Sequence, residues 1–147
     1  MTRIVLPNDV LLPQVGELLA EGKVVTMAVK GVSMLPFIVG GRDSVTLVRP
    51  DVLKTGDIAL AQIRKGYFVL HRIISIEGDI VTLMGDGNVR GCEKCRKKDV
   101  MGIAVRILKN GKETDCRSRM HLLNARLWRL LLPVRRYLLA VYRRVFL

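Results

Sequence analysis

The feature that most limits the possible folds is a succession of short apolar segments between residues 24 and 108. The segments are rich in β-branched and aliphatic residues. The breaks between them carry turn residues, as in Glu77-Gly78-Asp79 and Lys109-Asn110-Gly111. Short segments at this spacing are typical of strands in a mostly β domain. We predict strands at residues 24–29, 44–48, 57–63, 67–76, 80–84 and 100–108.

A short helix is expected before the first strand. Residues 9–21 carry apolar side chains at helical spacing, Asp9 suits the N-cap, and Gly22 suits the end of the helix.

The C-terminal segment differs from the rest of the chain in charge. The whole chain has a net charge of +12, and residues 117–147 hold eight arginines without any Asp or Glu. Residues 121–147 have the spacing of an amphipathic helix, with most arginines on one side and a kink at Pro133. We therefore predict a β-rich domain over residues 1–116 and a basic helical tail over residues 117–147.

Three roles fit such a tail. An arginine-rich amphipathic helix with aromatic residues suits the surface of an anionic membrane. It could instead pack against the β domain or a partner chain, leaving its arginines in water. Binding to nucleic-acid phosphates is the third role, but no recognition motif accompanies the charge, so nucleic acid is not an expected partner.

The sequence predicts a cytoplasmic location. No run reaches the ~18 apolar residues of a membrane-spanning helix, and residues 1–22 lack the pattern of a secretory signal. Peripheral contact with the membrane surface would then depend on residues 121–147.

Two segments carry candidate catalytic side chains. Ser33 lies in Gly31-Val32-Ser33-Met34-Leu35-Pro36, where a glycine permits a tight turn and a proline stiffens its exit. His71 lies within the apolar segment 67–76. Serine becomes a nucleophile when a base removes its proton, and histidine suits that role near neutral pH. Each residue also fits a structural role, Ser33 in an ordinary turn and His71 as a hydrogen-bonded member of a sheet.

A serine–histidine pair needs a third group to orient the imidazole. Asp86, in Gly85-Asp86-Gly87-Asn88, is one candidate, and Glu93 and Asp99 are others. Asp86 equally fits the stabilisation of a glycine-rich turn, and the choice stays open.

Four segments stand in one order along the chain, at residues 31–36, 56–58, 71–73 and 84–88. Together they resemble the type I signal peptidase family and its LexA-like relatives, over roughly residues 24–107. The resemblance implies a β-rich peptidase fold with Ser33 as the nucleophile. A histidine at position 71 is similar to the archaeal and endoplasmic-reticulum branch, which uses serine and histidine with an acidic partner. By position, Asp86 matches the first acidic residue of that branch, and Glu93 is nearest to the second.

The resemblance also implies how substrate would bind. A peptide would lie extended along an exposed strand edge, such as residues 24–29 and the segment before Ser33. Gly31, Val32, Met34 and Pro36 are the residues expected beside it. Small side chains next to the cut are expected for the family. The N-terminal membrane anchor of the family's exporting members and the helix-turn-helix domain of its LexA-like members have no counterpart in residues 1–22.

We therefore expect a serine endopeptidase acting on a peptide or precursor protein without a cofactor. Ser33 would be the nucleophile, His71 the general base, and Asp86 or Glu93 the third residue. The alternative is a non-catalytic module that keeps the fold to bind a peptide or partner. Cys92 and Cys95 have the spacing of a zinc half-site, and Cys116 and His121 could complete it. Because no second Cys-x-x-Cys or His-x-x-x-His follows, free thiols are expected and no metal.

Overall fold

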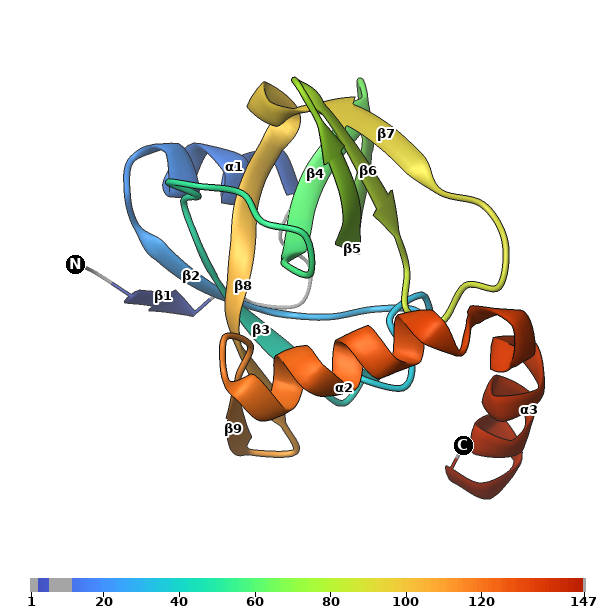
Figure 1. Cartoon of the computed structure of the whole chain (residues 1–147). Helices are drawn as coiled ribbons and strands as arrows, with labels where there is room; N and C mark the ends of the chain where they lie inside the picture. Colours follow the sequence, from blue (N-terminus) through green and yellow to red (C-terminus); the bar gives the residue numbers. More distant parts are fainter. Residues whose placement is uncertain (1–2, 6–11, 147) are drawn as a thin grey trace.

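A computed structural model describes residues 3–5 and 12–146, and its centre is a curled β-sheet (Figure 1). The expected mostly β fold, with a short N-terminal helix and a basic helical C-terminal segment, is confirmed. The strands of the described residues lie in the order β1-β2-β3-β8-β4-β5-β6-β7, and β9 pairs with β8. Their bounds are β1 Arg3–Val5, β2 Val24–Ala28, β3 Ser44–Val48, β4 Ile58–Arg64, β5 Tyr67–Glu77, β6 Ile80–Met84, β7 Glu93–Arg96, β8 Val100–Lys109 and β9 Lys112–Asp115.

The six predicted strands agree with β2 to β6 and β8 to within one residue at each end. The sequence did not predict β1, β7 and β9. The last two consist mainly of charged and polar residues and form strands by pairing along β6 and β8. Their conformation therefore depends on a partner strand more than on local propensity.

All strand pairs of the described sheet are antiparallel except β1 with β2. Several pairs shift register part-way along. Such bulges bend a strand and increase its twist, so the sheet curls around its core (Figure 1). The shifts lie at Thr46/Leu47, Leu60/Ala61, Gln62/Arg64 and Ile73/Ser75.

Helix α1 (Leu12–Ala20) lies within the predicted segment 9–21, and Asp9 falls outside the described residues. Gly22, at a φ of +84°, ends the helix, and its N–H donates to the Leu19 carbonyl. The helix buries its apolar face in the main core cluster. That cluster includes Val15, Leu19, Val25, Leu47 and Ile107.

The tail forms two helices instead of the single kinked helix expected from the sequence. Helices α2 (Arg119–Leu130) and α3 (Arg135–Phe146) are separated by a 3₁₀ turn at Leu132–Val134. Pro133 lies in that turn, and its ring nitrogen cannot donate the hydrogen bond that a continuous helix requires. Neither these two helices nor α1, the α-helices of the described residues, is long and apolar enough to cross a membrane.

Helix α2 packs against the β body (Figure 1). Its His121 and Ala125 are buried, and the His121 ring meets the Phe37 ring edge to face at 5.6 Å. The indole of Trp128 donates a 2.6 Å hydrogen bond to the backbone carbonyl of Asp86. His121 therefore belongs to the interior, although the sequence places it at the start of the basic tail.

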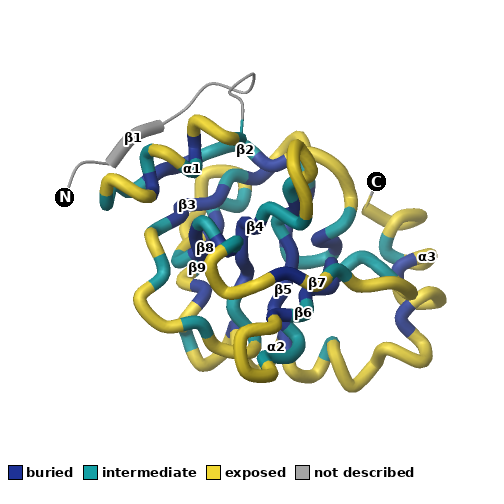
Figure 2. Tube along the Cα trace, turned by 90° about the horizontal axis from the view of Figure 1, so that it is seen from above, coloured by how far each residue is buried: buried dark blue, intermediate teal, exposed yellow. Residues whose placement is uncertain are grey.

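Helix α3 contacts the segment that follows Ser33. Leu139 is buried against Leu35 and Val39, and the guanidinium of Arg135 donates to the Asn88 carbonyl at 3.0 Å. Arg135, which departs from the amphipathic pattern of the tail, is itself buried. Figure 2 shows that α3 is otherwise mostly exposed. The inner faces of both tail helices thus hold the tail to the β domain.

We predict that His121 makes folding stability depend on acid. Burial, with the nearby Arg72 and Lys109, lowers the pKa of His121 from its ordinary value of 6.5 to about 4. Between about pH 6.5 and pH 4, His121 is therefore protonated in the unfolded chain but neutral in the folded chain. The free energy of unfolding falls as the pH falls through that range. Between pH 7 and pH 4.5 this effect should remove roughly 2 kcal/mol from the free energy of unfolding.

The measurement is urea unfolding of the wild type and of His121→Gln at both pH values. Glutamine keeps an acceptor near Arg72 and does not titrate, so the variant should lose less stability on acidification. Other acid effects are common to both proteins and cancel in the comparison. Equal losses in the two proteins would contradict the prediction.

Candidate active site

A cleft of about 870 Å³ opens beside the turn that holds Ser33. Its walls come from residues 27–30, from the first half of β5, and from the start of α1. Polar side chains that line it include Ser33, His71, Asn88 and Glu93. Three of the four predicted catalytic residues therefore meet in one cleft, although they come from separate parts of the chain.

The Ser33 turn is anchored by the residues that follow the serine. Met34 and Leu35 are buried, and the Met34 carbonyl accepts hydrogen bonds from the N–H groups of Phe37 and Ile38. Ser33 itself stays half-buried at the cleft. The serine is thus presented at the surface by a turn whose next residues are fixed in the core.

The Gly85–Asn88 segment packs against the backbone of this turn. The Gly87 N–H donates to the Ser33 carbonyl at 2.8 Å. A Cβ atom on Gly85 would fall inside van der Waals contact of the Ser33 carbonyl oxygen, and one on Gly87 would do the same to the Val32 carbonyl oxygen. Both glycines are therefore required by the close approach of two backbones.

His71 lies in β5, opposite Ala59 of β4, and its side chain is nearly buried. Its Nδ1 atom lies 2.5 Å from Oε1 of Glu93, the first residue of β7. The two atoms are close but not aligned as in an ideal hydrogen bond, and neither has another hydrogen-bond partner in the described part of the chain. Glu93 thus occupies one ring nitrogen of His71 and leaves Nε2 without a protein partner among those residues.

Asp86 lies on the other side of β5. Its carboxylate accepts hydrogen bonds from Arg72 Nε at 2.9 Å and Arg72 Nη2 at 2.7 Å, and both side chains are almost fully buried. Arg72 also donates to the Gly56 carbonyl and stacks over Phe37. Adjacent residues of a strand point to opposite faces, so Asp86 pairs with Arg72 while Glu93 approaches His71.

Ser33 and His71 line the same cleft, but no hydrogen bond joins their side chains in this structure. Among the described residues, the Ser33 hydroxyl and the Ser33 N–H have no hydrogen-bond partner. Hydrogen bonds of this kind are commonly long in an empty site and tighten when substrate is bound. Both groups are therefore available to an incoming ligand.

The residues expected to contact substrate have different positions. Met34 lines the cleft but is 2 % exposed, and its Sδ accepts a hydrogen bond from the Asp86 N–H. Gly31, Val32 and Pro36 shape the turn and are not part of the lining. The sequence did not predict that residues 67–70 line the cleft. The only sequence feature that indicates it is their position directly before His71, as residues 27–30 stand before the Ser33 turn.

The remaining candidates lie elsewhere. Asp99 accepts a hydrogen bond from the Arg96 N–H. Cys92 is exposed, whereas Cys95 and Cys116 are buried, and burial raises their pKa values to about 11 and about 12. Within residues 3–5 and 12–146 there is no group of three or more His, Cys, Asp or Glu side chains placed to hold a metal ion.

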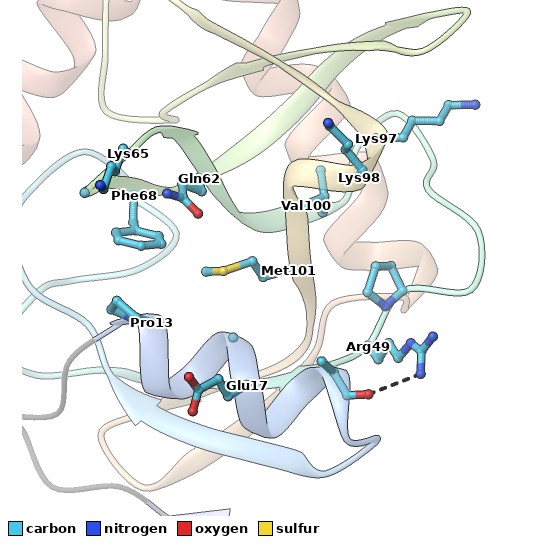
Figure 3. Close-up of a pocket in the computed structure, with 14 residues that line it drawn as sticks. Pro13, Glu17, Arg49, Gln62, Lys65, Phe68, Lys97, Lys98, Val100 and Met101 are labelled. Carbon is cyan, nitrogen blue, oxygen red and sulfur yellow. Dashed lines mark hydrogen bonds between the residues drawn. The ribbon is translucent and has the colours of Figure 1, made fainter.

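A second cleft of about 790 Å³ adjoins the first, and Pro13, Gly66 and Phe68 line both. Figure 3 shows Met101 near its middle and basic side chains around it. The guanidinium of Arg49 is held by a hydrogen bond to the Ala20 carbonyl at 3.3 Å. The basic residues of the lining are Arg49, Lys65, Lys97 and Lys98, and Glu17 is its acidic residue.

Comparison with known proteins adds no assignment to this geometry. No protein-family model matches the chain, and no curated protein matches its sequence.

We predict that Gly85→Ala destabilises the protein by displacing the Ser33 turn. The new methyl group would press on the Ser33 carbonyl oxygen, a backbone atom that cannot turn away. Overpacking of this kind costs about 1–3 kcal/mol, and urea unfolding measures it.

Gly16→Ala is the matched control. There the nearest atom is the flexible end of the Met101 side chain, and the site lies in α1, where alanine is favoured over glycine. It should be close to neutral. An equal loss in both variants would show that the contact with Ser33 is not the cause.

Proposed function

We propose that this chain is a serine endopeptidase similar to the signal peptidases, with Ser33, His71 and Glu93 as its catalytic residues. The contact between His71 Nδ1 and Glu93 Oε1, in the cleft that Ser33 also lines, is the observation that carries the proposal. A carboxylate beside an imidazole holds the ring in one orientation and stabilises its protonated form, as a serine–histidine mechanism requires. Such pairs in clefts are common at active sites.

The proposed mechanism follows from these positions. Ser33 Oγ attacks the carbonyl carbon of the scissile bond while His71 Nε2 takes the hydroxyl proton. Glu93 holds the imidazole through Nδ1 and stabilises its positive charge. The Ser33 N–H, which has no partner among the described residues, donates to the developing oxyanion. His71 then gives the proton to the leaving amine, and a water molecule activated by the same base hydrolyses the acyl-enzyme and releases Ser33.

Two open strand edges support an extended binding mode for the peptide. In the described sheet, β6 pairs with β5 only from Arg72 onward, and β1 pairs with β2 only as far as Thr26. Residues 67–71 and 27–30 therefore have a backbone edge to which no described strand pairs, and both segments line the cleft. Backbone hydrogen bonds from these edges would hold a peptide across Ser33, as in β-strand addition.

We place this activity in the cytoplasm. The three cysteines, all within the described residues, are free thiols, and unpaired cysteines suit a reducing compartment.

We predict that the two acidic candidates behave differently on substitution. Glu93→Gln should lower kcat by about 10²–10⁴ with little change in stability, because it loses only the charge beside His71. Asp86→Asn should lower the free energy of unfolding by about 3 kcal/mol or more, because it leaves the buried Arg72 unpaired. Cleavage of a peptide library with small residues at candidate cut sites, followed by mass spectrometry, measures the first effect, and urea unfolding measures the second.

Ser33→Ala and His71→Ala are the reference variants for this experiment, and both should abolish cleavage. An active wild type whose rate is unchanged by Glu93→Gln would remove Glu93 from the site. A wild type that binds library peptides without cutting them would favour the alternative, a non-catalytic peptide-binding module with the same edges.

The second cleft supports a preference for acidic substrates. It continues from the first through Pro13, Gly66 and Phe68, so a long peptide held at Ser33 can reach it. Lysines outnumber acidic side chains in its lining, and an acidic side chain of the substrate would complement them.

We predict faster cleavage of peptides that carry Asp or Glu some residues from the cut than of matched peptides with Lys there. The advantage should be about tenfold in kcat/KM at low salt and smaller at high salt. It should reverse in the triple variant Lys65→Glu/Lys97→Glu/Lys98→Glu. Lys112→Glu, on β9, is a control outside both clefts, and a similar change there would point to overall charge as the cause.

A further inference from the structure

The tail carries an unusual amount of apolar surface. Most large apolar side chains that the described residues expose lie in the two tail helices or the turn between them. Leu130 is 72 % exposed, and Phe146 is 69 % exposed. The tail outer face, as we define it, consists of Leu123, Leu127 and Leu130 of α2 and Tyr137, Leu138, Val141 and Val145 of α3.

These side chains do not hold the helices to the fold. The contacts of α2 with the β body include His121, Ala125 and Trp128, which lie on the side of the helix opposite Leu123, Leu127 and Leu130. Arg129 also donates a hydrogen bond to the Ile74 carbonyl of β5. On α3 the contacts are made by Arg135, Leu139 and Tyr142. Tyr137, Leu138, Val141 and Val145 lie on the neighbouring flank of that helix. Both helices therefore have an apolar outer face in addition to an anchored inner one. A helix that is apolar on both sides is normally covered on both.

The charge around the tail outer face indicates what covers it. Six arginines of the tail helices are exposed, and residues 117–147 contain no Asp or Glu. A second copy of this chain would bring two such basic faces together, which like-charge repulsion opposes. Nucleic acid would pair with the arginines but leave the leucines and valines in water. An anionic bilayer accepts both, since the arginines meet lipid headgroups while the apolar side chains enter the acyl boundary.

We propose that the outer face of α2 and α3 docks the protein on the surface of an anionic lipid bilayer. The helices lie on the membrane and do not span it, in agreement with their length. Because their inner faces contact Leu35, Val39 and the Asp86 carbonyl, the Ser33 turn is held next to the docked element. Binding itself requires no peptidase activity, so it can be tested separately from the proposed function.

The experiment is co-sedimentation of the full chain with vesicles of phosphatidylcholine alone and of phosphatidylcholine mixed with phosphatidylglycerol. We expect binding to the mixed vesicles about tenfold or more tighter than to the neutral ones, and weaker at ~0.5 M salt. Ser33→Ala should bind as the wild type does. Equal binding to both vesicles, or none to the anionic ones, would overturn the proposal.

Substitutions on the outer face locate the contact. Leu127→Glu/Leu130→Glu should weaken binding to the anionic vesicles about tenfold or more, because charges replace side chains that enter the acyl boundary. Val52→Glu/Ile80→Glu makes the same charge change at exposed apolar positions outside the tail and should bind like the wild type. Equal losses in the two double variants would assign the binding to overall charge and overturn the proposal.

A third variant covers the case in which the leucine substitutions disturb folding, which thermal unfolding would show. Arg143→Gln/Arg144→Gln removes two exposed charges of α3 and should weaken binding to anionic vesicles only. Light scattering without lipid tests the competing occupant. A dimer that dissociates in Leu127→Glu/Leu130→Glu, together with an absence of vesicle binding, would assign the face to a second copy and contradict the proposal.

Discussion

The buried ion pair of Arg72 and Asp86 is the interaction on which the arrangement of the site depends. It joins strand β5 to the Gly85–Asn88 segment, and the Trp128 hydrogen bond to the Asp86 carbonyl adds helix α2. A buried charge without its partner costs several kcal/mol, so these three elements are stable only when they are together. The same segment supports the Ser33 turn through Gly85 and Gly87. The position of the serine is therefore coupled to a charge pair on the far side of the strand from His71.

Strand geometry keeps the His71–Glu93 pair apart from the Arg72–Asp86 pair. His71 and Arg72 are consecutive, and the alternation of side chains along a strand directs them to opposite faces. On one face Asp86 is buried and accepts hydrogen bonds from Arg72 at both carboxylate oxygens. The other face takes Glu93 to the cleft, where His71 keeps one ring nitrogen free of protein hydrogen bonds in the described structure. Arg72, which has a structural role, and His71, which has a proposed catalytic role, are thus adjacent residues of β5.

The sequence predicts well those parts of the structure that depend on local pattern. Apolar segments between turns locate β2 to β6 and β8, since each carries its own β propensity. It could not choose between Asp86 and Glu93, because that choice depends on where the charged strand β7 pairs along β6, and spacing along the chain does not contain that register. The tail shows a second limit. A helical wheel drawn through Pro133 assumes one continuous helix. The 3₁₀ turn interrupts that helix, so the residues of α3 no longer follow the angular positions of the wheel, and Arg135 is buried.

The tail helices contact the β domain through their inner faces and expose apolar side chains on their outer faces. Ending the chain at Cys116 would remove the outer face, but it would also uncover Leu35 and Val39 and take away the Trp128 bond to Asp86. Loss of the proposed membrane contact and loss of the Ser33 turn would then occur together and could not be distinguished. Helix α3 is joined to the residues that follow Ser33 through the packing of Leu139 on Leu35 and Val39. Only substitutions confined to the outer face, which leave those contacts intact, can separate the proposed attachment from the proposed catalysis.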